Sequence, residues 1–165
     1  MDALKEGREP SLEDLTSNQT EVELRMPALL PEEFIPDVST RLSLYKRIAS
    51  AESEEELQEL KVEMIDRFGL LPDPARNLLD VAILRLKARA VGVRKIEASD
   101  KGGYFDFAPN NSVDPAWLIG LLQKDPKQWK LEGPTRLRFN RELSERKIRM
   151  EWVQGFVSQL AENRA

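Results

Sequence analysis

The chain has 165 residues, of which 41% are hydrophobic and 33% are charged, and its net charge at pH 7 is −4. This composition is typical of a soluble globular protein, and no apolar run approaches the roughly 20 residues that a membrane helix needs. The chain has no cysteine and no histidine, which excludes disulfides, thiolate nucleophiles, zinc ribbons and histidine general bases. The acidic N-terminus has no apolar run of the secretory type, so we expect a cytoplasmic protein.

The first residues differ in character from the rest of the chain. Residues 1–20 are polar and weakly periodic, and we predict that they are a linker or the tail of a preceding domain. Residues 21–165 are predicted to form the folded domain. At its start, residues 21–26 alternate apolar and charged side chains with the period of a half-buried strand, and Pro27 ends that strand.

Three helices are predicted next. Asp37 is a good N-cap for a helix over 38–50. A second helix begins with the capping box of Ser53 and Glu56 and ends near Phe68, where Gly69 follows. A third helix runs from Pro74 to about Val91. For the first of these helices we expect the following inward face: Val38, Leu42, Tyr45, Ile48 and Ala49.

The second half of the chain changes to a strand-like period. Two hairpins are predicted, one pairing 93–98 with 104–108 and the other pairing 128–131 with 135–140. A short helix over 115–124 separates them, and a long helix from 141 or 144 to 163 closes the chain. The expected inward stripe of the closing helix is Ile148, Trp152, Val153, Phe156, Val157 and Leu160. Early helices followed by antiparallel hairpins and a long C-terminal helix predict an α+β fold.

The helix after Ser53 carries a pronounced charge asymmetry. Between Glu52 and Asp66 there are seven acidic residues and the single base Lys61, a net charge of −6. At roughly 100° per residue, one row of carboxylates lies opposite the apolar stripe and comprises Glu56, Glu59, Glu63 and Asp66. No base in this stretch neutralises the row. Such a face is either a solvated helix surface or a docking surface for arginines.

The opposite charge prevails later in the chain. From Lys124 to Arg149 there are nine basic and four acidic residues, a net charge of +5. This excess suggests a nucleic-acid-binding surface. The bases alternate with acidic and apolar residues along strands and a helix, however, which favours ordinary solvated faces.

Enzymatic chemistry is poorly represented in the sequence. The only Gly-Gly pair, Gly102 and Gly103, lies between two strand-like runs and is typical of a hairpin turn, not of a phosphate-binding loop. A solvated row of carboxylates lacks the dry cleft in which paired acids acquire separated pKa values. We therefore predict no enzyme, with no catalytic, cofactor or metal site.

Two stretches resemble a known family. Residues 29–48 (LLPEEFIPDVSTRLSLYKRI) and 62–79 (VEMIDRFGLLPDPARNLL) are similar to the C-terminal domain of the bacterial transcription-repair coupling factor family, Mfd. The pattern I-P, then R-L-x-x-Y-K-R-I, then E-x-x-D-R-F-G-x-L-P is long and irregularly spaced. The similarity runs in order from about Glu21 to the end of the chain.

The resemblance implies a regulatory domain of a transcription-coupled DNA repair translocase. In that family the C-terminal domain folds back on a UvrB-like module of the same protein, masks its UvrA-binding surface and restrains the motor. RNA polymerase and DNA are contacted by other domains, and no membrane is involved. Glu63 and Asp66 would then meet arginines of the module, with Glu59 and Arg67 beside them, although Arg67 could instead brace the acidic row. The alternative is a nucleic-acid-binding accessory module that uses the basic C-terminal third.

Overall fold

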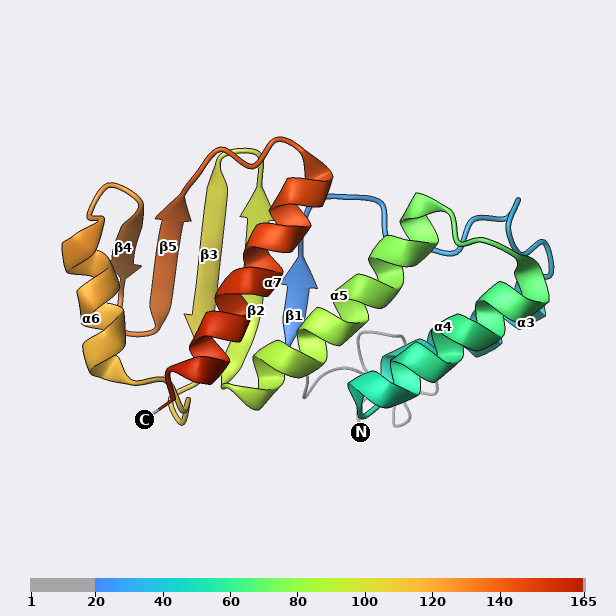
Figure 1. The fold of residues 1–165 in the computed structure, drawn as a ribbon, viewed down its shortest axis with the longest axis horizontal. Helices are drawn as coiled ribbons and strands as arrows, with labels where there is room; N and C mark the ends of the chain where they lie inside the picture. Colours follow the sequence, from blue (N-terminus) through green and yellow to red (C-terminus); the bar gives the residue numbers. More distant parts are fainter. Residues whose placement is uncertain (1–19, 165) are drawn as a thin grey trace, which may run out of the picture. The chain divides into compact units, whose positions relative to one another are not determined.

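The computed structural model describes residues 20–164, which form two compact units (Figure 1). Unit 1 contains Pro27–Ile83, and unit 2 contains Thr20–Met26 and 84–164. The predicted linker lies outside the described residues apart from Thr20, so it stays a prediction. Five helices and a five-stranded sheet occur between residues 20 and 164, which confirms the α+β class.

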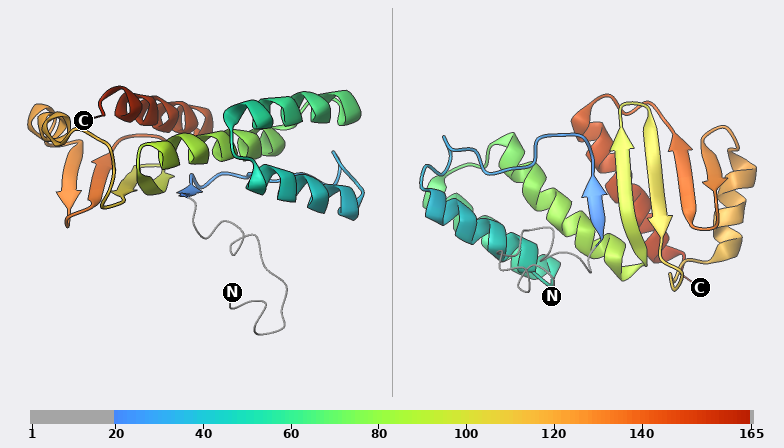
Figure 2. Two further views of the ribbon diagram at one scale, coloured as in Figure 1. Left: turned by 90° about the horizontal axis from the view of Figure 1, so that it is seen from below. Right: turned by 180° about the vertical axis from the view of Figure 1, so that it is seen from behind.

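Unit 1 is helical. It contains α3 (Val38–Ser50), α4 (Glu54–Phe68) and the first part of α5 (Asp73–Ala90). Asp37 caps α3 as predicted, because its carboxylate accepts a hydrogen bond from the Thr40 N–H at 2.9 Å. Figure 2 shows α3 and α4 lying side by side. Their buried side chains form the centre of the unit: Leu44, Ile48, Leu57, Leu60 and Met64.

The predicted inward face of α3 is wrong in part. Val38 and Leu42 have 57% and 56% of their surface exposed, whereas Leu44, which was not predicted, is buried. Tyr45 is half-buried, and its hydroxyl accepts a hydrogen bond from the Leu30 N–H at 2.8 Å. The helix therefore turns the side of Leu44 and Ile48 inward, and the side of Val38 and Leu42 faces solvent.

Unit 2 is built on a mixed sheet with the strand order β1-β2-β3-β5-β4. The strands are β1 (Glu21–Glu23), β2 (Val93–Ser99), β3 (Gly102–Phe107), β4 (Trp129–Glu132) and β5 (Arg136–Asn140). Both predicted hairpins are confirmed, since β2 pairs antiparallel with β3 and β4 pairs antiparallel with β5. Strand β1 is shorter than predicted and joins β2 in parallel, with Val22 opposite Ile96.

Two helices complete unit 2. The short helix α6 (Pro115–Lys124) follows the N-cap Asp114, and the closing helix α7 (Arg146–Glu162) lies against one face of the sheet (Figure 1). An aromatic cluster joins α7 to the sheet, because the ring of Phe105 lies 4.7 Å from Phe156 and 5.3 Å from Phe139 between centroids. None of the α6 side chains is fully buried.

A buried arginine interrupts the predicted stripe of α7. Ile148 is 47% exposed, whereas its neighbour Arg149 is only 2% exposed. The Arg149 guanidinium donates to the backbone carbonyl oxygens of Leu143 at 2.9 Å and Leu24 at 2.7 Å. It also reaches the carbonyl oxygen of Arg25 at 3.1 Å and a carboxylate oxygen of Asp100 at 3.1 Å. One side chain thus ties the end of β1, the β2–β3 turn and the start of α7 together.

Gly102 and Gly103 lie at the start of β3 and not in the turn itself. A Cβ atom on Gly103 would overlap the carbonyl oxygen of Glu97 and would lie 2.8 Å from the Ala98 Cα on β2. Gly102 adopts a φ of +138°, which L side chains rarely adopt. The pair is therefore required by the close approach of neighbouring strands and, at Gly102, by the positive φ.

Candidate docking surface on helix α4

Helix α4 has well-defined ends. The Ser53 hydroxyl accepts a hydrogen bond from the Glu56 N–H at 3.2 Å, and the Glu56 carboxylate accepts one from the Glu52 N–H at 3.0 Å. At the other end Gly69 adopts a φ of +96° and its N–H donates to the carbonyl oxygen of Ile65 at 2.9 Å. Both predicted ends are confirmed, and they hold the side chains between them on a rigid element.

All four predicted partner-binding residues lie on α4. Glu59, Asp66 and Arg67 are exposed, and Glu63 is half-buried. Spacings of three and four place Glu59, Glu63 and Asp66 on the side away from the buried leucines. The structure therefore brings the predicted carboxylates together on one helix face.

Glu63 does not match the expectation of an unneutralised row. Arg47 of α3 holds it with two parallel hydrogen bonds, from Nη1 to Oε2 at 2.7 Å and from Nη2 to Oε1 at 2.9 Å. Arg67, one helical turn further along α4, adds a third at 3.2 Å. The hydrogen bonds from Arg47, and the weaker interaction with Arg67, lower the pKa of Glu63 to about 2. The expectation was wrong because the neutralising arginine comes from a different helix.

Asp66 is the contrasting case. In residues 20–164 no hydrogen bond or ion pair engages its carboxylate, and the side chain is exposed. Arg67 is directed elsewhere, since its guanidinium bonds Glu63 and also lies 4.7 Å from the centroid of the Phe68 ring. Asp66 is thus a carboxylate held on a rigid helix with its acceptor atoms available.

An exposed apolar side chain accompanies these carboxylates. Val62 is 59% exposed and lies one helical turn before Asp66 and close to one turn after Glu59. We refer to Glu59, Val62, Glu63 and Asp66 together as the outer face of α4. Helical spacing could have identified Val62 from the sequence, because it lies off the stripe of Leu57, Leu60 and Met64.

The pairing of Glu63 has a testable pH dependence. Its pKa is below the ordinary value of 4.5, so its favourable interactions are fully present above that value and are lost as pH falls toward about 2. We expect the Glu63 carboxyl resonance in an NMR titration to have a midpoint near 2. Arg47→Ala should raise this midpoint most of the way back toward the ordinary value, and Arg67→Ala should raise it less, because the hydrogen bonds from Arg47 are the largest cause of the low pKa. An ordinary midpoint in the wild-type chain would contradict the pairing.

Two arginines of the basic C-terminal third are also paired. Arg138 makes two hydrogen bonds to the Glu132 carboxylate, at 2.9 and 3.0 Å. The Arg136 guanidinium lies 3.9 Å from the centroid of the Tyr104 ring and 3.8 Å from a carboxylate oxygen of Asp106. These arginines are engaged within the sheet, which leaves a less basic surface than the residue counts suggest.

Two further properties concern the described part of the chain. Across residues 20–164, no group of three or more acidic side chains is arranged to hold a metal ion. In the same range, no helix is long and apolar enough to cross a membrane.

The sequence matches a known domain family. A family model described as the TRCF domain matches residues 24–118, more than half of the chain. The chain belongs to the TRCF domain family. The resemblance found in the sequence is thereby confirmed.

Relatives of this TRCF domain are transcription-repair-coupling factors. The chain is 68% identical over 163 residues to that of Escherichia coli (strain K12), which covers 99% of the chain and 14% of the relative. It is 50% identical over 159 residues to that of Haemophilus influenzae (strain ATCC 51907 / DSM 11121 / KW20 / Rd), which covers 96% of the chain and 14% of the relative. A solved structure of the "C-terminal domain of transcription-repair coupling factor" shares the fold, with a TM-score of 0.74 at 23% identity, covering 87% of this chain and 92% of that one. The TRCF domain thus spans about one seventh of the length of these relatives.

Proposed function

We propose that this TRCF domain is a non-catalytic regulatory domain that docks on the UvrB-like module of its parent protein. Docking masks the UvrA-binding surface of that module and restrains the DNA translocase motor. The observation that carries the proposal is the outer face of α4. There the exposed carboxylate of Asp66, which has no partner among residues 20–164, lies beside an exposed apolar side chain, Val62.

Such a surface suits a partner that presents arginines around an apolar patch. Carboxylates on a rigid helix are set to accept paired N–H donors from a guanidinium, and a bidentate pair has a fixed geometry as well as a favourable energy. Val62 would lie at the centre of the contact, where water exclusion strengthens the neighbouring charge pairs.

The two acidic residues have different parts in this contact. Asp66 gains a partner on docking without losing one. Glu63 is already held by Arg47 and Arg67, so an arginine of the module must either share the carboxylate or displace one of them. We therefore assign the larger share of the docking affinity to Asp66, and a share to Glu63 that depends on this exchange.

The test is a titration of the separately expressed UvrB-like module with the chain and its variants. Asp66→Ala is expected to weaken binding about tenfold or more, because a desolvated arginine of the module loses its acceptor. Glu63→Ala should have a smaller effect, and the double variant should bind at least as weakly as Asp66→Ala. In the full-length parent, the double variant should expose the UvrA-binding surface, measured as increased UvrA capture.

Melting curves provide the control. Asp66→Ala should melt like the wild type, since the side chain is exposed and makes no hydrogen bond within the described chain. Glu33→Ala removes another exposed carboxylate of unit 1 outside α4 and should change neither quantity. If Asp66→Ala and the double variant melt normally and bind as tightly as the wild type, the outer face of α4 is a solvated surface and the proposal is wrong.

A further inference from the structure

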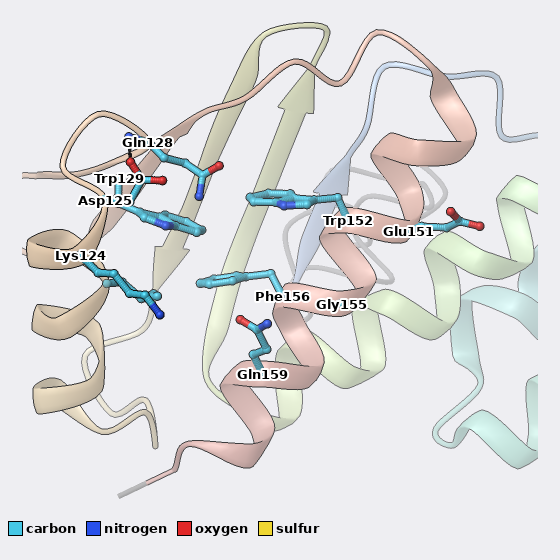
Figure 3. A pocket seen from close by; sticks show the side chains of 10 residues that line it. Lys124, Asp125, Gln128, Trp129, Glu151, Trp152, Gly155, Phe156 and Gln159 are labelled. Atoms are coloured by element: carbon cyan, nitrogen blue, oxygen red, sulfur yellow. Dashed lines mark hydrogen bonds between the residues drawn. The ribbon is translucent and has the colours of Figure 1, made fainter.

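A cleft in unit 2 has no part in the docking described above. It has a volume of about 570 Å³ and lies between α6, the turn that follows α6, strand β4 and helix α7 (Figure 3). Clefts of about 300–1,000 Å³ are the usual size for binding a small ligand or a few side chains of a partner. The lining side chains that matter here are Lys124, Gln128, Trp129, Trp152, Phe156 and Gln159.

Aromatic rings form the floor of the cleft. The ring of Trp129 lies 4.7 Å from Phe156 and 5.7 Å from Trp152 between centroids, and the planes are nearly parallel, at 29° and 23°. Trp152 and Phe156, one turn apart on α7, are inclined by only 8°. Trp129 and Phe156 are buried, with 6% and 4% of their surface exposed. Trp152 is half-buried and Gly155 beside it is exposed, so the accessible aromatic surface of the cleft belongs mainly to Trp152.

Gly155 has no evident role in the fold. It lies within α7 and lines the cleft, its φ is not positive, and a Cβ atom built there would meet nothing within 4 Å. Glycine in the middle of a helix is unfavourable relative to alanine. Gly155 thus lowers the stability of α7 and is not needed for packing. Its missing side chain leaves room at the cleft wall, so a ligand can approach the α7 backbone.

The polar groups that face the cleft are one ammonium group and two side-chain amides, and each amide can both donate and accept. Figure 3 shows Lys124 of α6 and Gln159 of α7 directed toward the aromatic rings, and Gln128 directed toward Trp152. Lys124 is the cationic group among the residues that point inward. The carboxylate of Asp125 is occupied by the Gln128 N–H at 3.3 Å.

The charges around the rim agree with this polarity. The Glu151 carboxylate points away from the cleft (Figure 3). A second cation stands at the rim, because the guanidinium of Arg141 lies 5.5 Å from the centroid of the Trp152 ring. The cleft therefore combines an apolar floor with an ammonium group and an amide. This arrangement is complementary to two neighbouring side chains of a ligand, one apolar and one with a carboxylate.

We propose that this cleft binds an extended peptide segment of a protein partner in which an aromatic or aliphatic side chain stands next to a carboxylate. The apolar side chain would lie on Trp152, the peptide backbone would pass Gly155, and the carboxylate would pair with Lys124. Single-stranded nucleic acid is disfavoured, because such sites need a basic groove along several phosphates, whereas the lining of this cleft has the single cation Lys124 next to the carboxylate of Asp125.

The test is a tryptophan-fluorescence titration of the chain with a nine-residue peptide of central sequence Phe-Asp-Leu flanked by glycine and serine. The readout is local, because the three tryptophans of the chain, Trp117, Trp129 and Trp152, all stack in this cluster. We expect saturable binding with a Kd below about 1 mM. Lys124→Glu should weaken this binding about tenfold and should strengthen binding of the matched Phe-Lys-Leu peptide.

Helix glycines supply the matched variants. Gly155→Leu should fill the cleft, weaken both peptides about tenfold and leave the melting temperature unchanged or higher. Gly120→Leu places the same side chain at an exposed position of α6 with nothing within 4 Å, and it should bind like the wild type. The proposal is overturned if neither peptide binds at 1 mM, or if Gly155→Leu binds the peptides like the wild type. It is also overturned if Lys124→Glu does not reverse the preference for the Phe-Asp-Leu over the Phe-Lys-Leu peptide, or if a ten-nucleotide oligothymidylate binds more tightly than the Phe-Asp-Leu peptide.

Discussion

Arg149→Ala is expected to lower the free energy of unfolding by about 3–5 kcal/mol. The Arg149 side chain is 3% exposed, and its guanidinium donates to three backbone carbonyl oxygens and to the Asp100 carboxylate. Alanine would leave those buried carbonyl oxygens without a donor and would leave a cavity where the side chain was. The measurement is urea unfolding followed by far-UV circular dichroism.

Two variants on the same helix control this prediction. Arg146→Ala removes an exposed arginine of α7 and should change stability by no more than about 0.5 kcal/mol. Arg149→Lys keeps the charge but lacks the planar fork, so it should fall between alanine and the wild type. A stability of Arg149→Ala within 1 kcal/mol of the wild type would show that the buried arginine does not hold these segments together.

Gly103→Ala is expected to destabilise the chain by about 3 kcal/mol or more. The new Cβ would overlap the carbonyl oxygen of Glu97 and would lie 2.7 Å from its carbonyl carbon. Both atoms belong to the backbone of β2, which pairs with β3 through Ala98 and Gly103. Relief of the clash therefore requires the strands to separate, and the thermal melt should shift to markedly lower temperature.

The matched comparison is Gly120→Ala. This glycine lies within α6, and a Cβ atom there meets nothing within 4 Å. Alanine should stabilise the helix by up to about 1 kcal/mol, opposite in sign to Gly103→Ala. Equal effects of the two substitutions would mean that glycine is tolerated in β3 for a reason other than the close approach of β2.

Local chemistry made α4 predictable. The Ser53 hydroxyl accepts a hydrogen bond from a backbone N–H of the first helical turn, and Gly69 ends the helix with a positive φ. Both interactions involve residues close together in the sequence, so the sequence alone is enough to predict both ends. The same holds for the second hairpin, where the predicted alternation is reproduced: Leu137 and Phe139 are buried, and the arginines at 136 and 138 are half-buried.

Features that depend on distant segments were not predictable. Helix α3 contains two apolar pairs with the same spacing of four residues: Val38 with Leu42, and Leu44 with Ile48. Helical spacing alone therefore could not decide which pair faces the core. The Arg47–Glu63 pair requires knowledge of how α3 lies against α4. Arg149 looks like a surface residue until the carbonyl oxygens of Leu24 and Arg25 are brought to it from the other end of the domain.

The position of β1 affects how the chain can fold during synthesis. Strand β1 belongs to unit 2, but all of Pro27–Ile83 separates it from the rest of that unit, and its link to Arg149 spans 125 residues. Contacts of such high sequence separation form slowly, whereas consecutive helices form early. During synthesis, we therefore expect the helices within Pro27–Ile83 to form first. The backbone groups of β1 remain unpaired until β2 has been synthesised, and the Arg149 hydrogen bonds form only after α7 has been synthesised.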